Sequence, residues 1–221
     1  MEYLLNNKSR EEIINGTILI VDKPYSWSSF DVVKKIRNTI MLNYKIKKIK
    51  VGHAGTLDPL ATGLLLICTG KMTKEISKFQ NQLKIYTGTF ILGSTTPSFD
   101  QETEIDNYYK INHIDKKLIN SILPNYIGDI NQTPPIYSAI KKEGRRLYNL
   151  AREGKKIEIK ERKVFVKKFE ITKIKLPEIE FLIECGKGTY IRSIANDFGK
   201  SLNSGAHLKN LRRIATGNFK I

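Results

Sequence analysis

Short apolar runs separated by polar residues predict a chain of strands with a few helices between them. The run from Thr17 to Val21 follows Gly16 and ends at Lys23-Pro24, which is typical of a strand closed by proline. Residues 45 to 51 alternate between lysine and apolar side chains, so they predict a strand with one face in water. An apolar run continues from Leu64 to Cys68, and the further predicted strands are Lys84–Leu92, Val164–Ile174 and Ile179–Cys185.

Apolar residues at helical spacing predict four helices. Ser28 to Asp31 has the spacing of a capping box, in which a serine hydroxyl and an acidic side chain satisfy backbone amides at a helix start. The apolar positions that follow at helical intervals, and so predict the buried face, are Phe30, Val33, Ile36 and Ile40. The other helices are predicted through Ile76, Phe79 and Leu83, from Lys116 to Leu123, and from Thr189 to Lys200.

Strands in sequence with helices at irregular intervals predict an α+β domain with a mixed, largely antiparallel sheet flanked by helices. Strict alternation of strand and helix, as in parallel sheets, is absent. Residues 95 to 109 are polar and acidic and predict a surface loop that contains Asp100. Residues 132 to 152 mix prolines, a glycine and a short helical pattern, which predicts an excursion from the core that carries basic side chains.

The length and hydropathy of the chain limit the classes of protein to which it can belong. A chain of 221 residues with 40% hydrophobic content fits one domain or two closely joined halves with a real core. No apolar run approaches the roughly 18 residues that a membrane span needs. The N-terminus lacks the basic start, apolar middle and cleavage site of a secretory signal, so we expect a cytoplasmic protein that does not associate with membranes.

The net charge of +16 favours a polyanionic partner, and nucleic acid is the first interpretation. Between residues 141 and 175 there are 14 basic and 5 acidic residues, interleaved with Tyr148, Phe165 and Phe169. Backbone phosphates are natural counter-charges for such a segment. The alternative is that lysine is simply abundant in a chain rich in lysine, isoleucine and asparagine.

The cysteines, the histidines and the absence of several motifs exclude a number of site types. Cys68 and Cys185 are far apart in apolar runs, and with only three histidines the chain has no close Cys/His spacing, so disulfides and structural zinc are not expected. The sequence from Gly63 to Lys71 fails as a phosphate-binding loop because Leu65 stands where glycine is required and Met72 follows the lysine. Serine-hydrolase and dinucleotide-binding motifs are also absent.

One acidic residue stands out in the stretch VGHAGTLDPLATG, residues 51 to 63. Asp58 precedes Pro59, which disfavours helical backbone and predicts an extended or turn conformation in a loop rich in glycine. The carboxylate is either a turn-forming group, as aspartates before proline often are, or a catalytic one.

Six blocks of the sequence stand in a fixed order between about Gly16 and the end of the chain. The most specific block is VGHAGTLDPLATGLL, and the others are ILIVDKP, KIYTGTFILGSTTPSFD, TPPIYSAIKKEGRRLYNLAREG, GKGTYIRSIANDFG and AHLKNLRR. Together they resemble the TruB family of tRNA pseudouridine synthases. The resemblance implies the pseudouridine synthase fold in one catalytic domain over residues 1 to 221, with an RNA-gripping insertion at about 131 to 162. Many members continue into a C-terminal RNA-binding (PUA) domain, which this sequence is expected to lack.

The resemblance implies isomerisation of uridine 55 in the T-loop of tRNA to pseudouridine, without metal or redox cofactor. Asp58 corresponds to the catalytic aspartate, which acts on the sugar as nucleophile or as base. Arg192 corresponds to the arginine that pairs with that carboxylate. Tyr86 corresponds to the tyrosine that stacks on the extruded uracil and helps to remove the C5 proton.

The remaining site residues follow from the same blocks. His53 matches the histidine beside the flipped base, Leu211 an apolar contact in the base pocket, and Asp100 an acidic position near the site. Lys23 lies in a segment next to the catalytic loop, and Tyr190 precedes Arg192. The basic residues expected to bind RNA in the insertion are Lys141, Arg145 and Arg146. The partner is then the T-arm of tRNA, and the protein is expected to act as a monomer.

Two other functions compete with this one. A non-catalytic tRNA binder or folding chaperone would keep the pocket without using it. A related synthase acting on other RNAs fits the blocks less well, because they match the tRNA type throughout.

Overall fold

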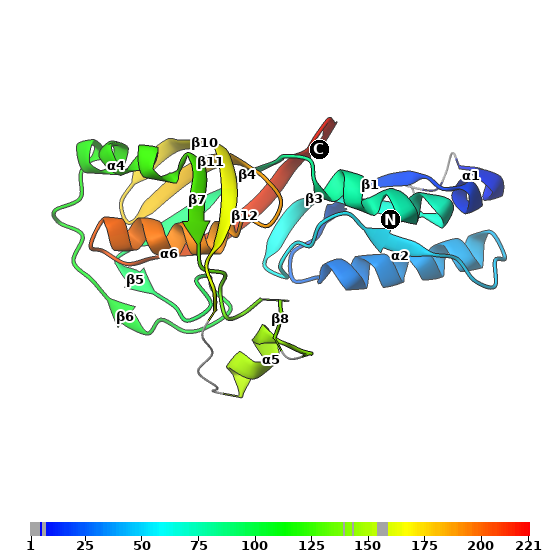
Figure 1. The fold of residues 1–221 in the computed structure, drawn as a ribbon, viewed down its shortest axis with the longest axis horizontal. Helices are drawn as coiled ribbons and strands as arrows, with labels where there is room; N and C mark the ends of the chain where they lie inside the picture. Colours follow the sequence, from blue (N-terminus) through cyan, green and yellow to red (C-terminus); the bar gives the residue numbers. More distant parts are fainter. Residues whose placement is uncertain (1–4, 6–7, 139, 143, 154–158) are drawn as a thin grey trace. The chain divides into compact units, whose positions relative to one another are not determined.

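The computed structural model describes Leu5 and residues 8 to 138, 140 to 142, 144 to 153 and 159 to 221; the side chains of Lys141, Lys142, Arg146 and Arg152 lie outside the description. This part of the chain divides into two compact units. Unit 1 holds the residues up to Tyr86 together with Leu211–Ile221, and unit 2 holds Thr87–Asn210. The chain leaves unit 1 within strand β4 and returns within strand β12 (Figure 1).

Unit 1 is built on mostly antiparallel strands. Strand β3 pairs antiparallel with β1 and with β2, and parallel with the C-terminal part of β12, which also pairs with β13. The elements are α1 (Arg10–Asn15), β1 (Ile18–Lys23), α2 (Ser29–Asn43), β2 (Val51–His53), β3 (Ala61–Thr69), η2 (Gly70–Glu75), α3 (Ile76–Gln80), β4 (Lys84–Leu92), β12 (Ala206–Thr216) and β13 (Phe219–Lys220).

Helix α2 packs against β1 and β3 and forms the main core of unit 1. Its capping box is formed as predicted: the Ser28 hydroxyl accepts from the Asp31 amide, and the Asp31 carboxylate accepts from the Ser28 amide. The apolar cluster includes Val33, Ile36 and Ile40 from the helix with strand residues on the facing sheet. Phe30, by contrast, is 62% exposed, so its predicted place in the buried face is wrong. At 100° per residue it lies about 60° beyond the edge of the buried arc.

The predicted strand at residues 45 to 51 is wrong except at its end. Only Val51–His53 pairs with β3, with Val51 opposite Thr69. The next position of the partner is Gly70, where β3 has ended and η2 begins, so no strand remains for the lysine-rich residues to pair with. The helix predicted through Leu83 is shorter than expected, because α3 ends at Gln80.

Unit 2 contains an antiparallel ribbon of long strands covered by helix α6. Strand β10 pairs antiparallel with β11 and with β7, and β11 is the neighbour of β4. The elements are β5 (Ser94–Thr95), β6 (Asn107–Tyr108), α4 (Lys116–Ile122), η3 (Leu123–Tyr126), β7 (Gly128–Gln132), β8 (Lys141–Lys142), β9 (Arg145–Arg146), α5 (Leu147–Arg152), β10 (Arg162–Lys175), β11 (Glu178–Cys185) and α6 (Ile191–Ser201).

Aromatic residues hold the core of unit 2 together. Phe90, Phe169, Phe181 and Phe198 have ring centroids 4.2 to 6.4 Å apart in their contacting pairs, and Tyr126 packs at their edge. Phe198 comes from α6 and the other phenylalanines from strands, so these rings fix the helix on the sheet. Together the pairings confirm the predicted α+β class with a mixed, largely antiparallel sheet.

The segment from 95 to 109 is not simply a surface loop. Thr96, Ser98 and Asp100 are buried, and the Thr96 and Ser98 hydroxyls donate to the Asp100 carbonyl at 2.6 and 3.2 Å. Asp100 also forms a bridge with Leu208 of β12. The polar composition misled the prediction, because these polar groups satisfy one another inside the fold.

In the described part of the chain, no helix has both the length and the apolar character to cross a membrane.

Candidate active site

The loop between β2 and β3 in unit 1 fixes the residues on both sides of Asp58. Leu57 is buried, and its amide donates to the Ser29 hydroxyl at 2.8 Å, which in turn donates to the Leu57 carbonyl at 3.0 Å. The Pro59 carbonyl accepts from the Lys23 ammonium at 3.2 Å. The half-buried Asp58 side chain therefore stands on a loop that is tied down one residue before it and one residue after it.

Lys23 is a fully buried cation beneath this loop. Its side chain is 0% exposed, and its ammonium donates to the carbonyls of Pro24, Trp27 and Pro59. Burial lowers the pKa of Lys23 to about 8, while the nearby Asp58 carboxylate acts in the opposite direction. The ammonium thus joins the turn at residues 24 to 27 to the loop and places positive charge next to Asp58.

Arg213 is a second buried cation in the same unit, and sequence reasoning assigned it no role. It is 1% exposed and donates from Nε to the Leu64 carbonyl at 2.7 Å and from Nη2 to the Gly55 carbonyl at 3.0 Å. Gly55 has a φ of +114°, which only glycine adopts readily, so the loop is shaped to turn its carbonyl toward the guanidinium. Among the described residues no carboxylate forms an ion pair with Arg213.

His53 lies at the start of the loop with a half-buried side chain. Burial lowers its pKa and the charge on Arg213 lowers it further, while a backbone hydrogen bond with Gly55 acts in the opposite direction. Its Nδ1 atom has no hydrogen-bond partner within the described residues.

Tyr86 and Leu211 complete the predicted residues of unit 1. Both are buried, Tyr86 on β4 and Leu211 on β12 opposite Ala61. Leu211 and Arg213 are two residues apart on one strand and therefore share a face of it. The spacing places Arg213 on the face of Leu211 but does not by itself indicate that the arginine is buried or which groups it contacts.

In unit 2, Arg192 and Asp100 form a buried ion pair. Arg192 is 3% exposed; its Nε lies 3.6 Å from Asp100 Oδ2, and its Nη1 and Nη2 donate to the carbonyls of Ser98 and Tyr137. The guanidinium thus connects the loop around Asp100 to the beginning of the insertion. Its pairing with Asp58, which the resemblance implies, joins residues of different units and stays a prediction.

Tyr190 is held in unit 2 by a pair of hydrogen bonds. Its amide donates to Gln132 Oε1 at 2.8 Å, and Gln132 Nε2 donates to its carbonyl at 3.0 Å. The Arg162 guanidinium lies over its ring at 4.9 Å from the centroid, so one face of the ring is occupied by a cation.

The structure describes only part of the insertion. Arg145 forms an ion pair with Glu153 on the same excursion. The side chains of Lys141 and Arg146 lie outside the described part of the structure, so their predicted contacts with RNA stay predictions.

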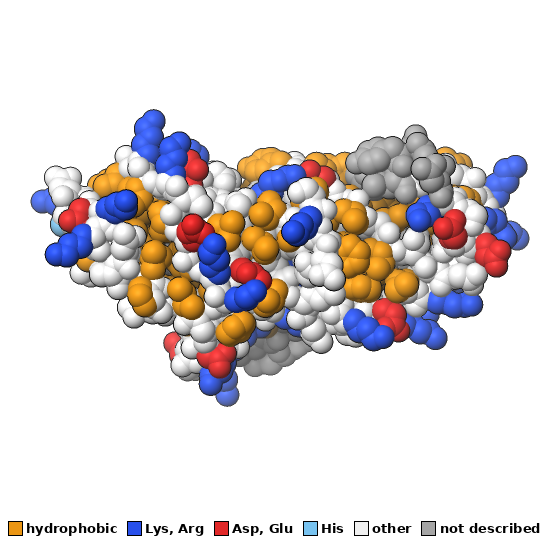
Figure 2. Space-filling model, turned by 90° about the horizontal axis from the view of Figure 1, so that it is seen from above, with side chains coloured by type: hydrophobic (Ala, Val, Ile, Leu, Met, Phe, Trp, Pro, Cys, Tyr) orange, Lys and Arg blue, Asp and Glu red, His pale blue; other side chains and the backbone are white. Residues whose placement is uncertain are grey.

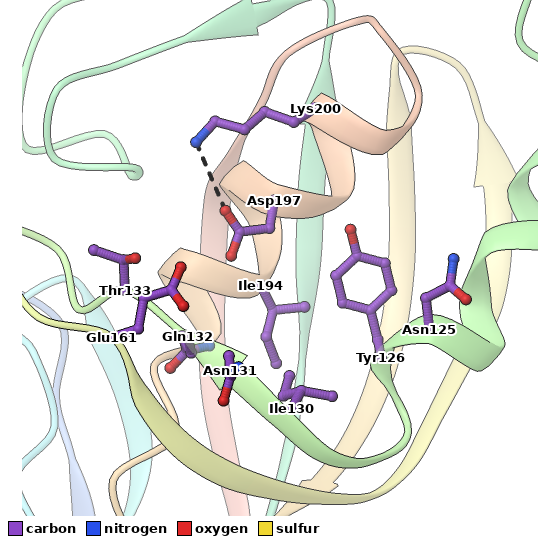
Figure 3. Close-up of a pocket in the computed structure, with 10 residues that line it drawn as sticks. All are labelled: Asn125, Tyr126, Ile130, Asn131, Gln132, Thr133, Glu161, Ile194, Asp197 and Lys200. Atoms are coloured by element: carbon purple, nitrogen blue, oxygen red, sulfur yellow. Dashed lines mark ion pairs between the residues drawn. The ribbon is translucent and has the colours of Figure 1, made fainter.

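A pocket of about 380 Å³ in unit 2 lies between α6, β7 and the start of β10 (Figure 3). Its lining includes two carboxylates, Glu161 and Asp197, and Lys200 Nζ lies 3.8 Å from Asp197 Oδ1. Burial raises the pKa of Asp197, and Glu161 adds to that rise. None of the predicted site residues lines it, and two carboxylates disfavour phosphate, so we do not assign the reaction to this pocket. The lining residues are Asn125, Tyr126, Ile130, Asn131, Gln132, Thr133, Glu161, Ile194, Asp197 and Lys200.

No group of three or more His, Cys, Asp or Glu side chains that could hold a metal occurs among the residues described. Cys68 and Cys185 are both buried, and burial raises the pKa of Cys68 to about 11.

Residues 41–191 match the family described as TruB family pseudouridylate synthase (N terminal domain), and the match includes Asp58 and its loop. The chain belongs to the TruB family. Other members are similar along nearly their whole length. A tRNA pseudouridine synthase B of Flavobacterium johnsoniae is 56% identical over 96% of this chain and 93% of the relative. One of Parabacteroides distasonis is 50% identical over 95% of this chain and 89% of the relative.

Solved structures support the fold of this TruB family member. A chain in the crystal structure of a Cbf5-Nop10-Gar1 complex superposes with a TM-score of 0.71 at 27% identity. It aligns with 96% of this chain, which spans about half of that longer chain. A chain in the structure of an H/ACA RNP bound to a substrate RNA gives a TM-score of 0.67 at 25% identity over 98% of this chain. The predicted pseudouridine synthase fold is therefore confirmed.

Two residues that position the Asp58 loop in this TruB family member were missed by sequence reasoning. Ser29 was interpreted only as part of a capping box, and its hydroxyl proves to bond both backbone groups of Leu57. Arg213 was only the last letter of the block AHLKNLRR. Neither the hydroxyl's partner nor the arginine's burial can be read from local spacing, since both depend on contacts between distant parts of the chain.

Proposed function

We propose that this protein converts uridine 55 in the T-loop of tRNA to pseudouridine, with Asp58 as the catalytic residue. The observation that carries the proposal is a family-specific aspartate whose neighbours, Leu57 and Pro59, are both fixed by side chains from another segment. The relatives that match over most of their length are named tRNA pseudouridine synthase B, which supports tRNA as the substrate.

The reaction rearranges bonds without gain or loss of electrons. The bond between C1′ and N1 breaks, the uracil turns in the site, and a bond between C5 and C1′ forms. The hydrogen on C5 leaves as a proton, and N1 takes up a proton, so the product is an isomer of the substrate. Asp58 acts on the sugar either as nucleophile or as base.

The buried cations explain how the loop holds the Asp58 carboxylate in place. Lys23 and Arg213 hold carbonyls of residues 55 and 59 and place positive charge under the loop. Charge fixed in a buried site needs no rearrangement during the reaction, so it stabilises an anion there more effectively than water would. Arg192 is proposed to pair with the same carboxylate, and Tyr86 to contact the extruded base.

Recognition of the T-arm is part of the proposal. A base in a folded loop must be drawn out of its stack at a cost of a few kcal/mol, which contacts to phosphates and aromatic side chains offset. His53, Leu211 and Tyr190 are proposed contacts near the base, and the basic insertion is proposed to grip the stem-loop. We expect a monomer that acts in the cytoplasm, where tRNA is its substrate.

Mapping pseudouridine at nucleotide resolution in an unmodified tRNA transcript tests this function. We expect one modified position, at nucleotide 55, in the full transcript and also in an isolated T-arm stem-loop. A transcript with cytidine at nucleotide 55 should contain no pseudouridine at any other position. Modification at other uridines would overturn the assignment, and binding without any pseudouridine would favour the chaperone.

A further inference from the structure

A segment of unit 1 directly before the Asp58 loop is entirely basic among its charged residues. Residues 32 to 50 contain seven lysines and arginines and no aspartate or glutamate. The segment comprises most of α2 and the irregular stretch that follows it. We call it the basic segment, and its charged residues are Lys34, Lys35, Arg37, Lys45, Lys47, Lys48 and Lys50.

Within the described part of the chain, the cations of the basic segment have no acidic partner at ion-pair distance. None of the seven forms an ion pair with a described residue. The nearest acid in sequence is Asp31, whose pKa is lowered mainly by hydrogen bonds from Ser28 and to a smaller extent by Lys34. All the lysines of the segment are exposed, and Arg37 is half-buried. Charges that a fold leaves exposed and unpaired are available to an anion from outside.

Three of the five lysines of the long strand β10 in unit 2 show the opposite arrangement. Lys167, Lys168 and Lys173 form ion pairs with Glu184, Glu170 and Glu180, at 3.0, 2.6 and 3.4 Å. On the face drawn in Figure 2, several basic side chains likewise lie directly beside acidic ones. Basic composition alone therefore does not identify an anion-binding surface; a row of cations without an acidic residue among them is the stronger indication.

Residues that flank the basic segment connect it to the Asp58 loop. Ser29, at the start of α2, bonds the Leu57 backbone in both directions. At the other end, Lys50 is followed by β2, which leads into the loop, and the Lys50 carbonyl accepts from Gly70. Helix α2 has 15 residues and is therefore about 22 Å long, so the segment reaches well beyond the loop itself.

Aromatic side chains mark the end of the segment next to the loop. Phe30 is exposed and lies four and seven residues before Lys34 and Arg37, so the three share one face of α2. Tyr25, 57% exposed, lies in the turn that the Lys23 ammonium holds. Exposed rings beside cations are the combination that binds a base together with its phosphates.

We propose that the basic segment is an RNA-binding surface that contacts substrate phosphates outside the target loop, with Phe30 against an exposed base or ribose. The inference rests on the proposed function for the identity of the RNA. It adds a second contact region, in unit 1, to the insertion in unit 2. Phosphate is the ligand because the segment offers several unpaired cations in a row. RNA is its source because Ser29 before the segment and β2 after it connect it to the loop that must receive a nucleotide.

The test is the salt dependence of tRNA binding. The triple variant Lys47→Gln, Lys48→Gln and Lys50→Gln should bind more weakly and show a slope of log affinity against log salt that is smaller by about 2, since each lost phosphate contact removes about 0.7. Between 50 and 200 mM salt the wild type should therefore lose roughly 16-fold more affinity than the variant. The matched control, Lys167→Gln, Lys168→Gln and Lys173→Gln, removes the same charge and should leave the slope unchanged.

An unchanged slope in the first variant overturns the proposal, and so does an equal change in both variants, which would indicate an effect of net charge alone. Phe30→Ala should weaken binding without changing the slope, and unaltered binding would remove Phe30 from the surface. At saturating enzyme the first variant should keep the wild-type single-turnover rate of pseudouridine formation. If the wild type forms no pseudouridine, the proposed function fails, while the slopes still decide whether the basic segment binds RNA.

Discussion

Among the side chains that the structure describes, each unit buries one arginine, and the two arginines are satisfied in different ways. Arg192 in unit 2 has a carboxylate, Asp100, at 3.6 Å as well as two carbonyls. Arg213 in unit 1 donates to the carbonyls of Leu64 and Gly55 and has no ion pair within the described residues. A buried charge without a counter-ion is costly, so folds keep one where its charge is used. The difference indicates that Arg192 has a strong structural role of its own, whereas Arg213 serves the Asp58 loop.

The largest expected effect comes from the residue that this loop presents. Asp58→Asn should lower the single-turnover rate of pseudouridine formation by more than about 10⁴-fold, as loss of a catalytic carboxylate does in other enzymes. Binding of tRNA should stay close to that of the wild type, because the amide has nearly the same shape. A variant with substantial activity would show that the loop positions some other group.

Arg192 should affect both activity and stability. Arg192→Met leaves Asp100 buried without its partner, which should cost about 3 kcal/mol in the free energy of unfolding. If the arginine also pairs with Asp58, the rate should fall by about 10³-fold. Asp100→Asn separates the two roles: it should lower stability in urea unfolding and leave most of the activity. Equal losses of activity in both variants would mean that Arg192 acts only through the fold of unit 2.

Arg213 should affect the chemical step more than stability or binding. Arg213→Met removes the donors to Gly55 and Leu64, and a loop displaced by about 1 Å can cost 10²-fold in rate. Arg213→Lys keeps the charge and one donor and should recover part of that loss. The measurement is the single-turnover rate at saturating enzyme alongside the tRNA dissociation constant. A loss confined to binding would place Arg213 outside the positioning of Asp58.

The smallest effect is a pH dependence of stability from Lys23. Its folded-state pKa is about 8 and lies below the ordinary value of 10.5, so between these pH values the unfolded chain binds a proton that the folded chain does not. Raising the pH through this window therefore favours the folded state. In urea unfolding, the unfolding free energy of the wild type minus that of Lys23→Met should increase from pH 8 to pH 10.5. A flat difference would mean that Lys23 titrates normally.

Local patterns predicted much of the fold. The capping box at Ser28, strand β4 and helix α4 follow from spacing within a few residues, and the structure confirms them. The failures depended on distant partners. The prediction of a strand at residues 45 to 51 was wrong because β3 ends at Thr69. The prediction that Phe30 is buried was wrong because helix α2 buries only one of its faces.

The candidate site was predictable only in part. The motif around Asp58 and its resemblance to a family pointed to the loop. The buried cations that support the loop could not be predicted from the sequence. Lysine and arginine are normally solvent-exposed, so nothing in the sequence indicates that Lys23 and Arg213 are buried beneath this loop. Basic composition was also misleading, since several lysines near the insertion are paired with glutamates and those before the loop are not.

The most direct test of the central claim is release of the C5 hydrogen from a tRNA transcript labelled with tritium at C5 of its uridines. Isomerisation breaks that bond once per modified nucleotide, so with excess protein the account predicts release of one C5 hydrogen per tRNA molecule. The release should come from nucleotide 55 and should be absent with Asp58→Asn. Tight binding of the transcript by the wild-type protein with no release of tritium would contradict the account.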